Sequence, residues 1–188
     1  MSRLTIYNET DSATPVLDSR DRQVMADELS ALGIRFEQWA AHAPLAADAD
    51  QDTVLAAYRD DVDRLMREGR YGSADVVRMK PDHPDRAAMR EKFLREHTHS
   101  DDEVRFFVEG SGAFYIHASA RVHMVVCEAG DLLSVPAGTT HWFDASDAPF
   151  FTAIRIFVSP EGWVASYTGS DIASRFPLYG REVTTTAR

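Results

Sequence analysis

Short runs rich in apolar residues recur through the second half of the chain, and turn residues separate these runs. The pattern predicts strands over residues 104–108, 113–117, 121–127, 132–135, 140–143 and 150–158, with turns at 109–112 and 128–131. Several short strands at even spacing with turn signals are typical of an antiparallel sandwich or barrel. We therefore predict a mainly β fold.

The first half of the chain predicts helices between short strands. Strand-like runs cover 4–7, 34–39 and 75–79, and residues 40–51 form a connection. One helix is expected over 20–32, with Asp18 or Ser19 as its N-cap and Gly33 after its C-terminus. A second is expected over 53–68, between Asp52 and Gly69. Pro84 suits the first turn of a third helix that runs towards residue 94.

Composition narrows the class of protein. At 188 residues and 44% hydrophobic, the chain fits a single domain with a sizeable core. The excess of 30 acidic over 20 basic residues argues against nucleic-acid binding. We expect no membrane association, because no apolar run is long enough to span a bilayer, and a cytoplasmic protein, because the N-terminus lacks a signal-peptide pattern. Cys127 stands alone, so no intramolecular disulfide can form, and it is expected to pack as a small hydrophobe.

The segment between residues 95 and 141 carries the candidate chemistry. Side chains two apart on a strand share a face, so His97 and His99 project together, as do Glu103 and Arg105. With His141 they offer three imidazoles and a carboxylate. This mixed set suits iron, nickel, cobalt, manganese or zinc better than calcium or magnesium. Four ligands on an octahedral ion leave two positions open, which is typical of a catalytic site.

A plainer interpretation is an exposed turn that happens to contain two histidines. Glu103, Gly110 and a second segment from Gly130 to His141 favour the metal site over this interpretation, because they suggest strands and turns that bring an inward-facing histidine to the first pair. The remaining histidines are expected at the surface or as ordinary sheet residues: His42, His83, His117 and His123.

Two motifs carry a family resemblance. His97-x-His99-x3-Glu103-x6-Gly110 and Gly130-x5-Pro136-x-Gly138-x2-His141 resemble the two cupin motifs. More narrowly, the runs 96–110, 135–144 and 151–157 resemble the acireductone dioxygenase family, as do residues 160–163 and 168–173. The resemblance is strong over residues 75–178. The N-terminal part resembles the family only in its general helical pattern.

The resemblance implies a cupin-type antiparallel β-barrel, or jelly roll, with several flanking α-helices, mostly N-terminal. It implies one domain over 1–188: a helix-rich part with barrel strands over 1–94, a metal-binding barrel core over 95–178 and a flexible tail over 179–188. The implied metal ligands are His97, His99, Glu103 and His141, which would hold one Fe(II) or Ni(II) per chain. The family also leans towards monomers.

The implied activity belongs to methionine salvage. The substrates would be dioxygen and the acireductone 1,2-dihydroxy-3-keto-5-methylthiopentene. The family yields 4-methylthio-2-oxobutanoate and formate with Fe(II), and 3-methylthiopropionate, formate and carbon monoxide with Ni(II). Glu96 matches the position that the family assigns to metal incorporation. Asp102 matches the position assigned to the relay of local change, and Arg105 the position assigned to formation of the substrate dianion.

The residues themselves leave several of these roles open. Arg105 could favour the ionised enediol, because a nearby positive charge lowers a pKa, or could be an exposed strand arginine paired with Asp102 or Glu109. Glu96 and Asp102 could instead be carboxylates that support the ligands from behind, or solvated acids. For Arg155, substrate contact and an internal ion pair are alternatives.

Aromatic residues could wall the thioether end of the substrate, since aromatic rings make favourable contacts with sulfur. Phe143 and Trp163 are the candidates, and Phe93 is ambiguous between this role and packing. For Trp142 we favour core packing. Two further classes of protein remain as alternatives: another metal-dependent cupin enzyme, such as a dioxygenase or a sugar-phosphate isomerase, and a non-catalytic cupin binding module.

Overall fold

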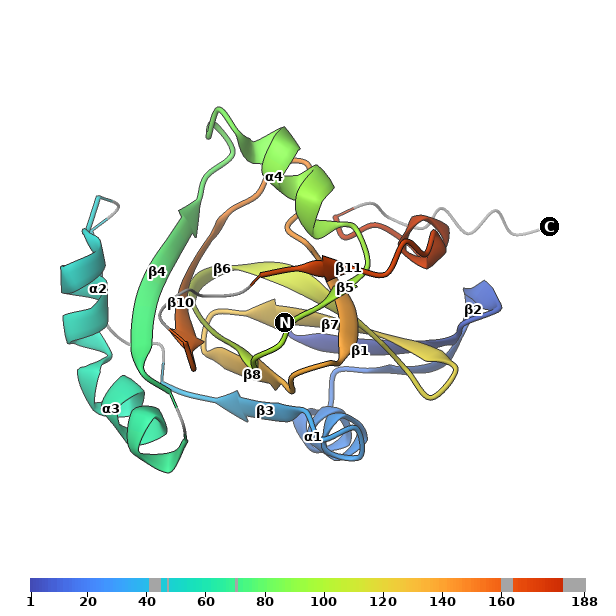
Figure 1. Ribbon diagram of the computed structural model, residues 1–188, viewed down its shortest axis with the longest axis horizontal. Coiled ribbons are helices and arrows are strands. Elements are labelled where there is room, and N and C mark those ends of the chain that lie inside the picture. The colour runs from blue at the N-terminus through green and yellow to red at the C-terminus, as the bar shows by residue number, and fades with distance from the viewer. Residues whose placement is uncertain (41–44, 47, 70, 160–163, 181–188) are drawn as a thin grey trace.

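The computed structural model describes residues 1–40, 45–46, 48–69, 71–159 and 164–180. Figure 1 traces the chain through these elements. The strands are β1 (Arg3–Asn8), β2 (Asp11–Ser19), β3 (Arg35–Gln38), β4 (Ser73–Met79), β5 (His97–Thr98), β6 (Glu103–Ala118), β7 (Arg121–Glu128), β8 (Asp131–Val135), β9 (Thr140–Asp144), β10 (Phe151–Phe157) and β11 (Ser166–Tyr167). The helices are α1 (Arg22–Ser30), α2 (Gln51–Ala57), α3 (Arg59–Glu68), α4 (Arg86–Phe93) and the 3-10 helix η1 (Ile172–Arg175).

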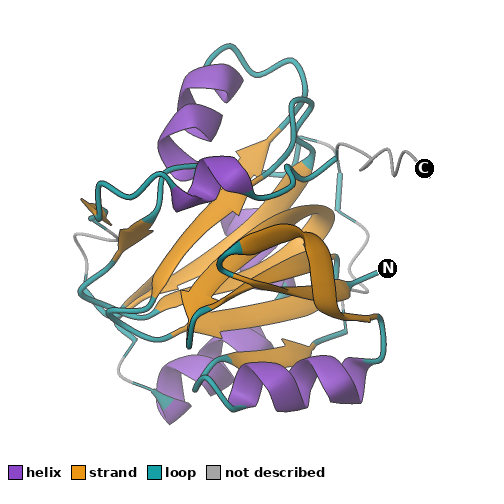
Figure 2. Cartoon of the chain, turned by 90° about the vertical axis from the view of Figure 1, so that its right-hand side faces the viewer, coloured by secondary structure: helices purple, strands orange, loops and turns teal. Residues whose placement is uncertain are grey.

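The strands form two antiparallel layers that share β6. One layer runs β11-β5-β9-β6-β7-β1-β2, and the other joins β4, β10, β6, β8 and β3. The first part of β6 pairs with β8 and β10, whereas residues 111–118 pair with β7. Figure 2 shows these strands at the centre with helices on the outside. The prediction of a mainly β, antiparallel fold with flanking helices is confirmed.

The predicted turn at residues 109–112 is wrong, because β6 continues through it as one strand of 16 residues. Gly110 lets the strand bend there instead, with φ +70° in the left-handed region. A Cβ at this position would lie 1.9 Å from the Phe150 carbonyl oxygen. Glycine is therefore required where β6 passes from one layer to the other.

Two other predictions at the N-terminal end need correction. Residues 11–19 form β2, so Asp18 and Ser19 belong to a strand, and Asp21 caps α1 by accepting from the N–H groups of Gln23 and Val24. The single helix expected over 53–68 is two helices that meet at Tyr58, and the cap is Asp50 rather than Asp52. Tyr58 leaves the helical conformation while its ring packs 5.1 Å from that of Phe106.

Alternation along β6 separates two environments, as expected. Val104, Phe106 and Val108 point outwards to a cluster that α2 and α3 cover, with Val54 and Leu65 among its helical members. The opposite face, with Glu103 and Arg105, points into the barrel. The barrel interior continues beyond them as an aromatic and aliphatic core that includes Phe107, Phe114, Phe143 and Phe151.

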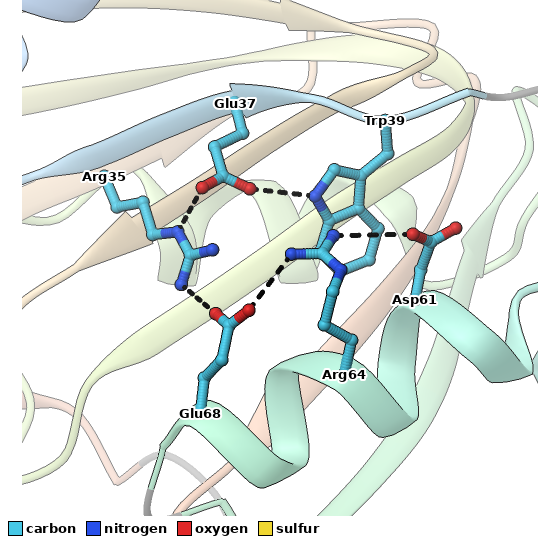
Figure 3. A network of polar contacts seen from close by, with 6 residues as sticks. All are labelled: Arg35, Glu37, Trp39, Asp61, Arg64 and Glu68. Atoms are coloured by element: carbon cyan, nitrogen blue, oxygen red, sulfur yellow. Dashed lines mark hydrogen bonds and ion pairs between the residues drawn. The ribbon is translucent and has the colours of Figure 1, made fainter.

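A polar network ties α3 to β3 beside this outer cluster (Figure 3). Arg35 contacts Glu37 at 2.6 Å and Glu68 at 3.0 Å, and Arg64 lies 5.1 Å over the Trp39 ring. Partly exposed ion pairs contribute little to stability. The network therefore sets the orientation of α3 against β3. The buried apolar side chains of α3, Val62 and Leu65, supply most of the stabilisation.

Core packing is confirmed for Trp142, which stacks on Tyr115 with ring centroids 5.1 Å apart in a cluster outside the barrel. The predicted frayed tail lies mostly outside the described residues, but Tyr179 is held by two contacts. Its N–H donates to Asp144 at 3.0 Å, and its hydroxyl bonds Ser111. Within the described part of the chain, every helix is too short or too polar to cross a membrane.

Gly110→Ala is expected to destabilise the fold far more than Gly138→Ala. Both glycines have positive φ, but an added Cβ at Gly138 meets nothing within 4 Å. The control should cost about 1 kcal/mol and the Gly110 variant about 3 kcal/mol or more. Thermal unfolding in the presence of a chelator should show melting points lowered by about 3 °C and about 10 °C. Equal shifts would contradict the bend assigned to Gly110.

Candidate metal centre

Strands β5, β6 and β9 bring the four candidate ligands together, with His99 directly after the end of β5. His97 lies on β5 and pairs with His141 on β9, while Glu103 begins β6. His97, His99, Glu103 and His141 are only 2–8% exposed. Their ligand atoms all lie within 4.8 Å of one another. The expected convergence of these residues is confirmed.

A backbone carbonyl orients each imidazole. Nδ1 of His97 donates to the Arg95 oxygen at 2.6 Å, and Nδ1 of His141 donates to the Thr139 oxygen at 2.8 Å. Nδ1 of His99 donates to the Val164 oxygen at 3.0 Å. A carbonyl only accepts, so the proton of each neutral ring lies on Nδ1. Each Nε2 then turns a lone pair towards the centre, as in histidines that bind metals.

Glu103 faces these nitrogens with its own lone pairs. One oxygen, Oε2, lies 3.1 Å from Nε2 of both His99 and His141, and the other accepts from Arg105 Nη2 at 2.8 Å. Burial alone would raise the pKa of Glu103, but the Arg105 guanidinium and the two histidines hold it well below its usual value. The carboxylate is therefore ionised although it is buried.

Converging lone pairs around a buried carboxylate repel one another unless a positive charge lies between them. Burial lowers the pKa of His97 to about 4, so this ring is neutral. Burial also opposes the charged form of His99, but its bond to Glu103 raises its pKa above the usual value. A proton on His99 can supply the positive charge between the donor atoms, and a divalent cation can take the place of this proton. The donor set thus fits a metal ion.

Arg105 lies inside the barrel next to this group, not at the surface. Its side chain is 6% exposed, and its Cζ lies 4.6 Å over the Phe143 ring and 5.1 Å over the Phe114 ring. The alternative of an exposed strand arginine paired with Asp102 or Glu109 is wrong. Arg105 shares a face with Glu103, as the alternation predicts.

Glu96 and Asp102 support the loops around the centre. Glu96 is buried, and its carboxylate bonds His117 at 2.7 Å and Thr168 at 2.5 Å. Asp102 accepts from the Ala137 N–H at 2.9 Å in the turn between β8 and β9. Both carboxylates therefore have protein partners, so a fully solvated acid is excluded at either position. Their roles in the reaction stay predictions.

A small apolar pocket adjoins Phe143, and none of the four candidate ligands lines it. Met79, Met89, Phe93 and Phe151 share its lining with Phe143, and α4 covers it. Phe143 is buried and Phe93 half-buried. The two phenylalanines proposed for substrate contact thus lie together, whereas Trp163 lies outside the described residues.

Arg155 has an internal partner. Its Nε and Nη2 donate to the carboxylate of Asp75 at 2.8 and 2.5 Å, which ties β10 to β4. On β10 it pairs with Arg105 across the sheet. The ion-pair alternative therefore describes its contacts, and substrate binding by Arg155 stays a prediction.

Sequence reasoning missed the groups that orient the histidines. The carbonyl of Val164 carries no sequence signal, because every residue has one. The sequence gives no signal for Thr168 and predicts His117 as an ordinary surface or sheet residue, whereas the structure places both around Glu96. The sequence offers one signal for His117: it is a polar residue at the end of an otherwise apolar strand, 113–117.

Comparison with known proteins agrees with this geometry. The family model described as the ARD/ARD' family matches residues 3–165. The acireductone dioxygenase of Parvibaculum lavamentivorans is 63% identical over 97% of this chain and 99% of that protein. The acireductone dioxygenase of Pseudomonas aeruginosa is 52% identical over 95% of this chain and 98% of that protein.

A solved structure shows the same architecture. The acireductone dioxygenase from Bacillus anthracis, with a cadmium ion in its active centre, superposes with a TM-score of 0.78 at 29% identity. The match covers 89% of this chain and 98% of that one. Fold and sequence comparisons therefore point to the same family.

Adding a divalent metal should stabilise the protein through Glu103. Ni(II) at about a thousand times its dissociation constant should add about 4 kcal/mol and raise the melting point by roughly 10 °C over chelator-treated protein. Glu103→Gln should lose most of this shift, because the amide removes the negative ligand. Asp102→Asn keeps its acceptor oxygen and should retain the shift. A full shift in Glu103→Gln would exclude the carboxylate as a ligand.

Proposed function

The chain belongs to the acireductone dioxygenase (ARD/ARD') family, and we propose that it cleaves an acireductone with dioxygen at the centre built by His97, His99, Glu103 and His141. The observation that carries the proposal is the buried convergence of three oriented imidazoles and one ionised carboxylate. Arg105, bonded to that carboxylate, adds a positive charge where an anionic substrate would lie.

We propose Fe(II) or Ni(II) as the bound ion, one per chain. Three nitrogens and one oxygen form a donor set that both ions accept. When bound, the ion would supply a Lewis acid for the substrate, and His97, His99, Glu103 and His141 would hold it. The expected products are 4-methylthio-2-oxobutanoate and formate with Fe(II), and 3-methylthiopropionate, formate and carbon monoxide with Ni(II).

Arg105 is proposed to favour the doubly ionised enediol. A guanidinium stays charged throughout, so it acts as an electrostatic stabiliser and not as a base. Its contacts with Phe114 and Phe143 exclude water around it, which strengthens its effect on a neighbouring anion. Its bond to Glu103 holds it beside the ligands.

Phe143 and Phe93 are proposed to receive the methylthio end of the substrate. The Phe143 ring contacts Arg105 and also lines the apolar pocket under α4. A substrate with its enediol near Arg105 could extend its apolar tail past Phe143, where aromatic rings and two methionines offer favourable sulfur contacts. For the protein as a whole, a monomer and a cytoplasmic location stay predictions, which size-exclusion chromatography and cell fractionation would test.

Anaerobic mixing followed by oxygen tests the proposed reaction. Synthetic acireductone is mixed with Fe(II)-loaded or Ni(II)-loaded protein, oxygen is admitted, and the loss of substrate absorbance is followed beside a protein-free control. Both metal forms should consume substrate faster than the control, and only the Ni(II) form should release carbon monoxide. If neither form exceeds the control, the proposed activity is wrong.

Arg105→Gln should lower kcat about 100-fold with little change in metal content, because removing one buried electrostatic stabiliser typically costs this much. The glutamine side chain ends near the position of the Arg105 Nε, so the variant removes both the charge and the bond from Nη2 to Glu103. Arg105→Lys keeps the charge and should retain part of the activity. Steady-state kinetics beside metal analysis measures both effects. An unchanged kcat in Arg105→Gln would remove this residue from the mechanism.

A further inference from the structure

The segment from Val164 to Thr168 orients a candidate ligand although little apolar packing holds it. Val164 is 69% exposed and Tyr167 36% exposed. Strand β11 pairs with β5 through two residue pairs, and Figure 1 shows the two side by side. Yet the Val164 carbonyl accepts the Nδ1 proton of His99. Polar contacts must therefore fix this carbonyl in place.

Glu96 supplies two of these contacts. Its backbone carbonyl accepts from the Thr168 N–H at 3.2 Å, and its carboxylate accepts from the Thr168 hydroxyl at 2.5 Å. Arg95 adds a third contact by lying 4.0 Å over the Tyr167 ring. Because Glu96 precedes His97 directly, its side chain points to the opposite face of the strand, away from the four ligands. It can hold the segment without entering the centre.

His117 fixes the Glu96 carboxylate from the other side. Its Nδ1 lies 2.7 Å from Glu96 Oε1, and its Nε2 lies 3.0 Å from Glu9 Oε2. Burial opposes a charge on this ring, but the two carboxylates raise its pKa above the usual value. A ring that donates from both nitrogens bridges the half-exposed Glu9 and the buried Glu96.

We propose that His117 is a positioning residue that fixes the metal ligand His99 through Glu96, Thr168 and the Val164 carbonyl. The inference rests on the proposed metal centre and adds residues that lie outside it. Partners that orient ligand histidines typically change metal affinity 10-fold to 100-fold when they are lost. If Thr168 is released, water can replace the Val164 carbonyl, and His99 loses its fixed orientation.

Two amide substitutions separate the two bonds of His117. The amide nitrogen of asparagine lies near the position of Nδ1, whereas that of glutamine lies near Nε2. His117→Asn therefore keeps the donor to Glu96, and His117→Gln keeps only the donor to Glu9. Two further substitutions test the bond between Thr168 and Glu96. Thr168→Ser keeps the hydroxyl, whereas Thr168→Val removes it and leaves a side chain of nearly the same volume. Glu9→Gln perturbs only the outer contact.

Metal affinity and spectra measure the effect. Competition between each protein and a chromophoric chelator for Ni(II) gives the dissociation constant, and the visible bands of the Co(II)-loaded protein report the ligand geometry. His117→Gln and Thr168→Val should raise the dissociation constant about 10-fold or more and shift the Co(II) bands. His117→Asn, Thr168→Ser and Glu9→Gln should stay close to the parent protein in both measurements. Melting points with chelator identify any variant that is simply unfolded.

Three outcomes are decisive. If His117→Gln and Thr168→Val bind Ni(II) like the parent protein, the positioning role is wrong while the metal centre stands. If His117→Asn loses as much affinity as His117→Gln, the bond to Glu96 is not the cause and the proposal is also wrong. If the parent protein itself binds no Ni(II), the proposed function fails with it.

Discussion

One electrostatic constraint governs the centre of this molecule: a buried carboxylate faces imidazole nitrogens that point their lone pairs at it. Such a group is unstable unless positive charge fills the space between the donors. Arg105 neutralises one oxygen of Glu103 from the barrel side. The other oxygen faces His99 and His141 and requires a proton or a metal ion. The barrel thus folds around a site that is built for a cation.

The path of β6 makes this arrangement possible. Its first half belongs to one layer and carries Glu103 and Arg105, and its second half belongs to the other and pairs with β9, which carries His141. A turn at Gly110 would have let the two halves separate. A continuous bent strand instead connects the residues that carry Glu103 with the residues that pair with β9, so the distance between Glu103 and His141 depends on this backbone bend.

Period-two alternation predicted the faces of β6 and the convergence of the ligands, because it depends only on local backbone geometry. The same reasoning failed at Gly110, where a glycine-rich stretch predicts a turn equally well and only the pairing with β10 selects the bend. It also failed at Tyr58, where tertiary packing on Phe106 interrupts a helix that local propensity would continue. The carbonyls of Arg95, Thr139 and Val164 could not be predicted at all, because backbone acceptors leave no trace in a sequence.

Charge balance explains why an arginine stands next to the carboxylate ligand. Without Arg105, a divalent ion and Glu103 would together carry one net positive charge, which a singly ionised enediol would neutralise. With Arg105 the net charge rises by one, so a doubly ionised enediol is needed to bring the buried centre to neutrality. Because uncompensated charge is costly where water is excluded, a metal-loaded centre would favour the more electron-rich form of the proposed substrate. On the proposed function, the residue that stabilises Glu103 in the free protein is therefore the one that selects the reactive form of the substrate.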